Sequence, residues 1–470
     1  MRSAPSARIV FRASLLLACS LAGAAVEAPA AKPPHIVYLL ADDLGWRDVG
    51  FHGGEANTPN LDRLAAGGAM LNALYVQPYS SQTRAALLTG RYPMRYGLQS
   101  LSITRASGYG LPAEERTLAQ QLKEAGYRTA FVGEWLLGHA RADYWPTRRG
   151  FDSFYGSLSG TAVSLIQKGS KPDWRRGERA AAGEAGYVTE LLAREAVALI
   201  RRHDASTPLF LLVAFNAPAR YADMPAAALE AYRHIADDTR RHYLAAVTGL
   251  DSAVGEIISA LEDRHLLNDT LVVFHSDNGG AIPTRFPTGD GDVRRPAADN
   301  GVFRDGTGSL HEGGVRSAAI MHWPGRIAPK TVVTGLVHVT DLHTTLLGVA
   351  GVPVDPKHNL DGVDVWPTIA DGRLTPRKEM LLNVDDFHGA IRIGEWKLIV
   401  HAALPARIEL FDIANDPEEA ENKASAYPER VRELLDRLNA YAYEMAPSLY
   451  LNSLVPAASP ALWQANPPAR

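Results

Sequence analysis

The sequence predicts an α/β fold in which helices cover both faces of a mostly parallel sheet, followed by a small C-terminal α+β domain with an antiparallel sheet. Buried parallel strands are continuous apolar runs in sequence, and such runs occupy residues 35–41, 209–215 and 270–275. Amphipathic helical stretches separate these runs, as in a sheet covered on both faces. From residue 376 onward the pattern changes to a hairpin, a short strand and one helix.

The first half of the chain alternates between strand and helix patterns. The apolar run His35–Ala41 predicts the first strand, and Thr58–Gly68 predicts a helix with Pro59 in its first turn and glycine at its end. The further elements of this half are a strand at Met70–Val76, a helix at Arg84–Leu88, a helix at Glu115–Ala125 and a strand at Arg128–Val132.

The second half continues this alternation. Its predicted elements are a helix at Tyr187–Arg202, a strand at Leu209–Phe215, a helix at Thr239–Leu261, strands at Thr270–His275, Ala318–His322 and Gly335–Val339, and a helix at Leu342–Ala350. Residues 281–310 are rich in glycine, proline and charged residues, which predicts a long ordered loop over the strand ends. Residues 353–376 are rich in proline, glycine and aspartate, which predicts a connector.

The small C-terminal domain is predicted from three elements. These are a hairpin at Ala390–Val400, a strand at Glu409–Ile413 and an amphipathic helix at Pro428–Met445. We therefore expect a main domain over residues 35–375, the small domain over residues 376–446 and a tail over residues 447–470.

Residues 1–28 have the pattern of a secretory signal peptide. Three arginines precede the apolar run Ala13–Val26, and small residues follow, with candidate cleavage points after Ala24 or Ala28. This pattern predicts an exported protein, either periplasmic or secreted. The alternative is a lipid anchor on Cys19, the only cysteine, which follows the sequence Leu-Leu-Ala. Cleavage behind Cys19 leaves no thiol for a disulfide or a zinc site.

Composition limits the partners. A formal net charge of −4 over 470 residues, without a basic stripe, excludes a nucleic-acid binder. We expect no membrane span once the signal peptide is removed. No sequence pattern indicates an oligomeric state.

The segment Val76–Gly90 supplies the first candidate catalytic residues. It places Ser80 and Arg84 where an apolar strand gives way to a helix. A helix start offers free N–H groups and a positive dipole end, so a hydroxyl and a guanidinium at this turn predict oxyanion chemistry. Helix capping by a serine is the structural alternative.

Two acidic pairs supply the candidate metal ligands. Asp42 and Asp43 follow the strand at residues 35–41, and Asp277 and Asn278 follow the strand at residues 270–275. Ligands of open α/β sheets gather at the carboxyl ends of strands, and adjacent buried carboxylates are costly unless a cation neutralises them. An all-oxygen donor set suits Ca²⁺ or Mg²⁺ rather than zinc. Solvated turns are the structural alternative for both pairs.

The sequence from about His35 to Met445 resembles the sulfatase family, in the style of its arylsulfatase B-like branch. The resemblance is carried by TPNLDRLAAGG, TRAALLTGRYP, GYRTAFVGEW, PTRRGFDSFYG, HSDNGG, HEGGVRS, LDGVDVWP and ELFDIANDPEEAEN. It implies an alkaline-phosphatase-like α/β core with a small antiparallel C-terminal domain, and one Ca²⁺ at Asp42, Asp43, Asp277 and Asn278. It also implies a small-molecule or glycan ligand, with a sulfated ligand as the expectation from the family's substrates.

The catalytic positions depart from the family pattern. In sulfatases the residue at Ser80 is oxidised to formylglycine, and the modifying enzymes recognise a proline two residues on and an arginine four residues on. Arg84 matches the arginine, but Gln82 replaces the proline. Two lysines and two histidines of the family are replaced here by Glu134, Leu136, Ala219 and Thr307.

Three functions are compatible with this pattern. The first is a pseudo-sulfatase, a cation-binding protein whose pocket binds a ligand without hydrolysing sulfate esters. The second is a divergent active sulfuric ester hydrolase acting on sulfated carbohydrates or aryl sulfates, with His311 and Arg304 as the residues that could compensate. The third is a phosphoesterase, which ranks last because no His/Asp set that could hold a second metal occurs at suitable strand ends.

Overall fold

A large mixed sheet positions the functional site. The computed structural model describes residues 1, 32–160, 165–167, 173–181, 183–281 and 297–454. Within these residues a ten-stranded sheet has the order β14-β2-β13-β11-β1-β10-β4-β5-β7-β8. Its centre consists of five parallel strands, β11 (Thr270–Ser276), β1 (His35–Asp42), β10 (Leu209–Pro218), β4 (Arg128–Glu134) and β5 (Ser153–Ser157). Residues 2–28 of the predicted signal peptide, including Cys19, residues 282–296 of the predicted long loop and residues 455–470 of the predicted tail lie outside the described residues.

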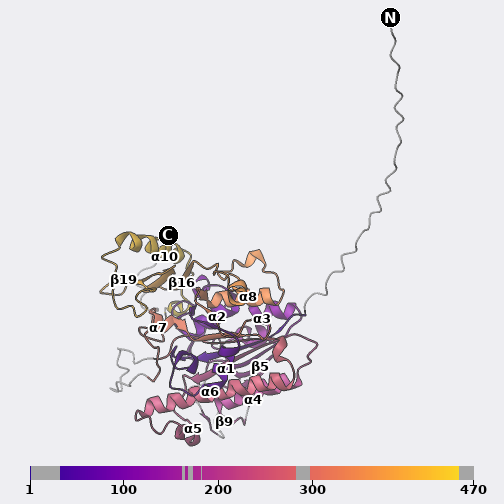
Figure 1. Ribbon diagram of the computed structural model, residues 1–470. Coiled ribbons are helices and arrows are strands. Elements are labelled where there is room, and N and C mark those ends of the chain that lie inside the picture. The colour runs from indigo at the N-terminus through magenta and orange to yellow at the C-terminus, as the bar shows by residue number, and fades with distance from the viewer. Residues whose placement is uncertain (2–31, 161–164, 168–172, 182, 282–296, 455–470) are drawn as a thin grey trace, which may run out of the picture. The chain divides into compact units, whose positions relative to one another are not determined.

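Helices cover both faces of this sheet, as the sequence predicts (Figure 1). One face packs against α1 (Pro59–Gly67), α4 (Val188–Arg202) and α6 (Asp238–Asp263), and the other against α2 (Ser80–Thr89), α3 (Leu118–Glu124) and α8 (Val339–Val349). The buried strand β1 shows why both faces are apolar. Val37 and Leu39 point into the first layer, whereas Tyr38 and Leu40 point into the second.

Shorter strands extend the sheet at both edges and form two small sheets. At the edges are β13 (Ala319–His322), β2 (Ala69–Leu71), β14 (Thr331–Val333), β7 (Arg175–Arg176) and β8 (Arg179–Ala180). The small sheets consist of β12 (Arg316–Ser317), β3 (Leu74–Tyr75) and β15 (Val337–His338), and of β6 (Leu165–Ile166) and β9 (Gly186–Tyr187).

The long helix α6 belongs to the core. In the described part of the chain it is the one helix long and apolar enough to cross a membrane, and 72% of its most apolar window is buried inside the fold. It packs against α4 and β10.

Three predicted elements differ from the structure. The single strand predicted at Met70–Val76 is wrong, because the chain turns after β2 and enters a different sheet as β3. The helix predicted at Arg84–Leu88 begins earlier, at Ser80. The strand predicted at Gly335–Val339 is only two residues long, because His338 and Asp341 form a capping box that starts α8 at Val339.

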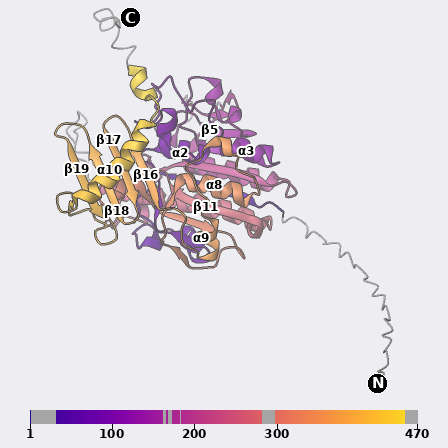
Figure 2. The ribbon, with the colours of Figure 1, turned by 90° about the horizontal axis from the view of Figure 1, so that it is seen from above.

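The predicted C-terminal antiparallel sheet is confirmed. Its strands are β16 (Glu379–Val384), β17 (His388–Ile393), β18 (Trp396–His401) and β19 (Arg407–Asp412), paired in sequence order. Helix α10 (Pro428–Tyr443) lies across one face of this sheet through Leu434 and Leu438 (Figure 2). The connector predicted at residues 353–376 contains α9 (Trp366–Asp371), which packs beside α8.

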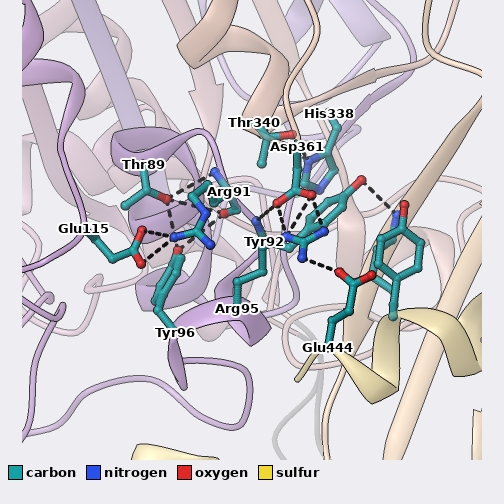
Figure 3. A network of polar contacts seen from close by, with 12 residues as sticks. Thr89, Arg91, Tyr92, Arg95, Tyr96, Glu115, His338, Thr340, Asp361 and Glu444 are labelled. Atoms are coloured by element: carbon teal, nitrogen blue, oxygen red, sulfur yellow. Dashed lines mark hydrogen bonds and ion pairs between the residues drawn. The ribbon is translucent and has the colours of Figure 1, made fainter. Parts of the chain in front are cut away.

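The other face of the C-terminal sheet is joined to the core by buried charges. Lys397 on β18 lies 3.0 Å from Glu312, which begins the short helix α7 (Glu312–Val315), and 2.8 Å from Glu419. The side chains of these three residues are fully buried. A second connection runs through Arg95, which contacts Asp361 and also Glu444 beyond α10 (Figure 3). Lys397 therefore fixes the C-terminal sheet against the start of α7, which directly follows the loop at residues 304–311.

Candidate functional site

Four neighbouring strand ends form the floor of the site. In the parallel register, Ala41 of β1 pairs with Ser276 of β11, and Asp42 pairs with Pro218 of β10. The strands β11, β1, β10 and β4 therefore deliver their following residues to one edge of the sheet. The predicted pairs Asp42–Asp43 and Asp277–Asn278 meet there, as the strand-end argument requires.

Helix α2 begins directly over this edge. Ser80 is its first residue, and its hydroxyl lies 3.1 Å from Asp42 Oδ1 and 3.1 Å from Asn278 Oδ1. One turn later, Arg84 donates from Nη2 to Asp277 Oδ2 at 2.9 Å and from Nη1 to the carbonyl of Glu134. The structure thus brings both predicted catalytic residues into contact with the predicted metal ligands.

The three carboxylates of the site are crowded. Oxygens of Asp42, Asp43 and Asp277 lie within 4.8 Å of one another. Burial and the charge of Asp42 raise the pKa of Asp43 to about 7. Burial and the same charge also raise the pKa of Asp277 well above its usual range, against the opposing effect of Arg84. The protein's own groups therefore leave this cluster with excess negative charge.

A divalent cation fits this donor set. Three carboxylates and the side-chain oxygen of Asn278 are hard oxygen donors, which suit Ca²⁺ or Mg²⁺ rather than zinc. The single hydroxyl proton of Ser80 faces two acceptor oxygens and can satisfy only one fully. A cation among these oxygens would neutralise the repulsion that raises the carboxyl pKa values.

The four replaced family positions all contact this cluster or the turn beside it. The carbonyl of Glu134 accepts from Arg84, the carbonyl of Leu136 accepts from Ser81 at 2.8 Å, and the N–H of Ala219 donates to the carbonyl of Asp42 at 3.0 Å. The Thr307 hydroxyl lies 3.1 Å from Asp43 Oδ1 and donates to the carbonyl of Gly279 at 2.6 Å. None of these four side chains carries a cation or an imidazole.

The Arg84 guanidinium supplies a positive charge at this turn. Burial alone would lower its pKa, but the charges of Asp277, Asp42 and Glu134 outweigh burial and raise it. The Arg84 side chain is 4% exposed, and its guanidinium is held by Asp277. Its charge is therefore largely balanced by the cluster.

Backbone strain marks the same site. Asp43 and Leu136 adopt left-handed conformations, with φ of 58° and 57°. Such conformations are uncommon for residues other than glycine and cluster at functional sites.

Gln82, at the position of the family's proline, is fully buried, and its amide donates to the carbonyl of Gln99 at 2.6 Å.

A pocket of about 470 Å³, here named the outer pocket, adjoins this site. Two of its lining residues connect it to the site. Tyr79 directly precedes Ser80, and Thr307 contacts Asp43. Its walls come from the loop at residues 304–311, from strands of the C-terminal sheet and from residues near the end of the described chain. His311 and Arg304, predicted as compensating residues, line this pocket, while the Ser80 hydroxyl contacts the acidic cluster.

Most residues of the outer pocket carry no recognisable signal in the sequence. Among its lining residues are His388, His401 and Arg407, which come from three different strands of the C-terminal sheet. Each follows an ordinary alternating strand pattern, so no local signal distinguishes it from a surface residue.

Comparison with known proteins agrees with this architecture. A family model described as Sulfatase matches residues 34–352, and one described as N-sulphoglucosamine sulphohydrolase, C-terminal, matches residues 306–444. Arylsulfatase J of Mus musculus is 34% identical over 89% of this chain and 77% of its own length. N-acetylgalactosamine-6-sulfatase of Canis lupus familiaris is 36% identical over 82% of this chain and 74% of its own length.

Solved structures agree as well. The crystal structure of Ps i-CgsB in complex with k-i-k-neocarrahexaose superimposes with a TM-score of 0.80 at 28% identity, covering 89% of this chain and 94% of that one. The PsFucS1 sulfatase from Pseudoalteromonas sp. gives a TM-score of 0.73 at 25% identity, covering 88% and 90% of the two chains. The fold and the acidic strand ends define an alkaline-phosphatase-like α/β protein. The chain belongs to the sulfatase family.

Proposed function

We propose that this protein binds one divalent cation, Ca²⁺ with Mg²⁺ as the alternative, together with a carbohydrate ligand. We further propose that it does not hydrolyse sulfate esters, although its relatives are named as sulfatases. The observation that carries this proposal is the set of contacts made by Glu134, Leu136, Ala219 and Thr307. All four positions adjoin the acidic cluster or the turn beside it, and none carries an ammonium or an imidazole that would protonate the leaving oxygen or place positive charge on a sulfate group.

The loss of catalytic rate expected from these four replacements is large. General acid–base catalysis contributes about 10²–10⁴-fold to a rate, and electrostatic stabilisation of the transferring group contributes a comparable factor or more. At Glu134 a buried carboxylate replaces an ammonium, so the side chain repels a sulfate group instead of attracting it. In a partly screened site, two unit charges about 4 Å apart interact by about 4 kcal/mol.

The residues that remain are suited to binding. Asp42, Asp43, Asp277 and Asn278 would hold the cation, which would supply positive charge for a ligand oxygen. Ser80 would offer its hydroxyl at the start of α2. The neighbour solved with a neocarrahexaose supports a carbohydrate as the ligand class. The signal-peptide pattern of residues 1–28 supports export as part of this proposal.

One observation favours a second function, a divergent active hydrolase. Ser80 lies at the start of α2 with its hydroxyl 3.1 Å from Asp42, and Arg84 is retained one turn later. In this alternative Ser80 is the nucleophile, either directly or after modification. It requires groups outside the four replaced positions to protonate the leaving oxygen.

Two measurements on the same preparation test the proposal. Calorimetric titration with Ca²⁺ is expected to show one site, weakened at least about tenfold by Asp43→Asn, since fewer charged ligands lower Ca²⁺ affinity. Asp143→Asn is the matched control, because this aspartate side chain is 58% exposed. Sulfate release from a sulfated oligosaccharide is expected to equal the buffer blank. Absence of Ca²⁺ binding, or sulfate release that Ser80→Ala abolishes, would contradict the proposal.

A further inference from the structure

The outer pocket has two chemically different walls. Two arginines and three histidines line it against only two carboxylates, Asp305 and Asp385. Aromatic side chains also line it, namely Tyr79, Phe387 and Tyr450. Phe387 is 51% exposed although it is a large apolar residue, and such exposure in a hollow is typical of a contact surface for a ligand.

The cationic wall is organised around Glu409 on β19. Its carboxylate lies 2.9 Å from His401 Nε2, 3.5 Å from Arg407 Nε and 3.7 Å from Arg304 Nη1. The Glu409 side chain is only 10% exposed, whereas those of Arg304 and Arg407 are 37% and 56% exposed. One carboxylate thus positions two arginines and a histidine, and the two arginines remain open to the pocket.

His311 is a buried residue that supports this arrangement. Its side chain is 3% exposed and lies between Asp305, at 2.8 Å from Nδ1, and Glu409, at 3.5 Å from Nε2. Burial alone would lower the pKa of His311, but its contacts with these two carboxylates outweigh burial and raise it. His311 is therefore a positioning residue, since it is too buried to offer much surface to a ligand.

From this geometry we propose that the outer pocket binds an acidic group on the carbohydrate ligand, a carboxylate or a sulfate, through Arg407, His388 and His401. The proposal rests on the carbohydrate-binding function proposed above and names its ligand class, an acidic oligosaccharide. The sugar bearing this group lies beside the one at Ser80, because Tyr79 lines the pocket and directly precedes Ser80. The aromatic side chains would pack against the apolar faces of the sugar rings.

The charge of the pocket depends on pH through His388. Asp385, His401 and Arg407 face this imidazole, and Phe387 packs beside it. The hydrogen bond with Asp385 raises the pKa of His388, while burial and the charge of Arg407 act in the opposite direction. His388 is therefore protonated below this raised pKa, and affinity for an acidic ligand is expected to fall as the pH rises through it.

The test uses the full chain loaded with Ca²⁺ and three oligosaccharides of equal length. One is an oligogalacturonate, one a sulfated galactan oligomer and one a neutral galactan oligomer. Calorimetry at about pH 6 and about pH 8 brackets the range in which histidine titrates. The variants are Arg407→Gln and His388→Gln. The matched control is Arg432→Gln on α10, because this arginine is 65% exposed and does not line the pocket.

We expect an acidic oligomer to bind at least about tenfold more tightly than the neutral one at about pH 6, since a hydrogen bond to a charged group contributes an affinity factor of about this size. Arg407→Gln should lower the affinity for the acidic oligomer about tenfold and leave the affinity for the neutral oligomer unchanged. His388→Gln should flatten the dependence on pH. Whether the uronate or the sulfated oligomer binds more tightly identifies the acidic group.

Equal affinity for the acidic and neutral oligomers would overturn the inference. So would Arg407→Gln and His388→Gln variants that bind as the Arg432→Gln control does. Ca²⁺ titration and sulfate release on the same samples report on the proposed function separately. Loss of Ca²⁺ binding, or Ser80-dependent sulfate release, counts against that function, whereas the effect of Arg407→Gln on acidic oligomers reports on the outer pocket.

Discussion

Removing the divalent cation is expected to make the stability of this protein depend on pH through Asp43. Burial and the charge of Asp42 raise the pKa of Asp43 from 3.8 to about 7. A carboxyl group whose pKa is raised on folding contributes stability that is fully present below its unfolded pKa and is lost as the pH rises to the folded pKa and beyond. The affected window therefore runs from about pH 4 to about pH 7.

The size of this effect follows from the shift. At about 1.36 kcal/mol per pKa unit, a rise from 3.8 to about 7 corresponds to at most about 4 kcal/mol, since Asp43 retains some exposure to solvent. At most about 3 kcal/mol of this falls between about pH 5 and about pH 8. Bound Ca²⁺ removes the effect, because it favours the ionised carboxylate throughout.

Urea unfolding in chelator and in Ca²⁺, at these two pH values, measures the effect. In chelator, the wild-type protein is expected to lose more unfolding free energy between the two pH values than Asp43→Asn does. Asp143→Asn controls for a general change in charge, because this exposed aspartate lies outside the cluster. Parallel loss of stability in the wild-type protein and in Asp43→Asn would refute the reasoning about the site.

Three further predictions follow from other parts of the structure. Lys397→Met leaves Glu419 buried without its cation and is expected to lower the unfolding free energy by about 3–5 kcal/mol in urea titrations, with partial recovery when Glu419→Gln is added. Mass spectrometry of the peptide containing Ser80 is expected to show unmodified serine, because Gln82 replaces the proline of the modification motif; an aldehyde at this residue would contradict the pseudo-sulfatase function. Glu409→Gln is expected to lower the pKa of His311, measured by NMR titration of its imidazole protons; an unchanged titration would show that Glu409 does not hold this ring.

The sheet and the acidic cluster were accessible from sequence because each depends on a local pattern. His35–Ala41 is apolar throughout and ends in Asp42, so the strand and its polar end can be recognised together. Two such strands paired in parallel must bring their following residues to one edge. The structure confirms that the two strand ends are adjacent, because Ala41 pairs with Ser276.

Other elements escaped prediction for identifiable reasons. Strand β5 contains Gly156, whose φ is 144° and whose Cβ, if present, would lie 2.0 Å from the carbonyl of Gly133. This close approach requires glycine, and glycine weakens the strand pattern in sequence. The outer pocket escaped because Tyr79, His311 and Arg407 are far apart in the chain and only packing of the C-terminal sheet onto the core brings them together.

Sulfate release by the Ca²⁺-loaded protein distinguishes a binding protein from a hydrolase. The protein would be incubated at a concentration equal to that of a sulfated oligosaccharide, and free sulfate would be measured by ion chromatography beside Ser80→Ala and a buffer blank. The proposed function predicts that wild-type protein, Ser80→Ala and blank give the same sulfate, while the protein retains bound Ca²⁺. Sulfate release by the wild-type protein that is absent in Ser80→Ala would show that the four replaced positions have not abolished hydrolysis.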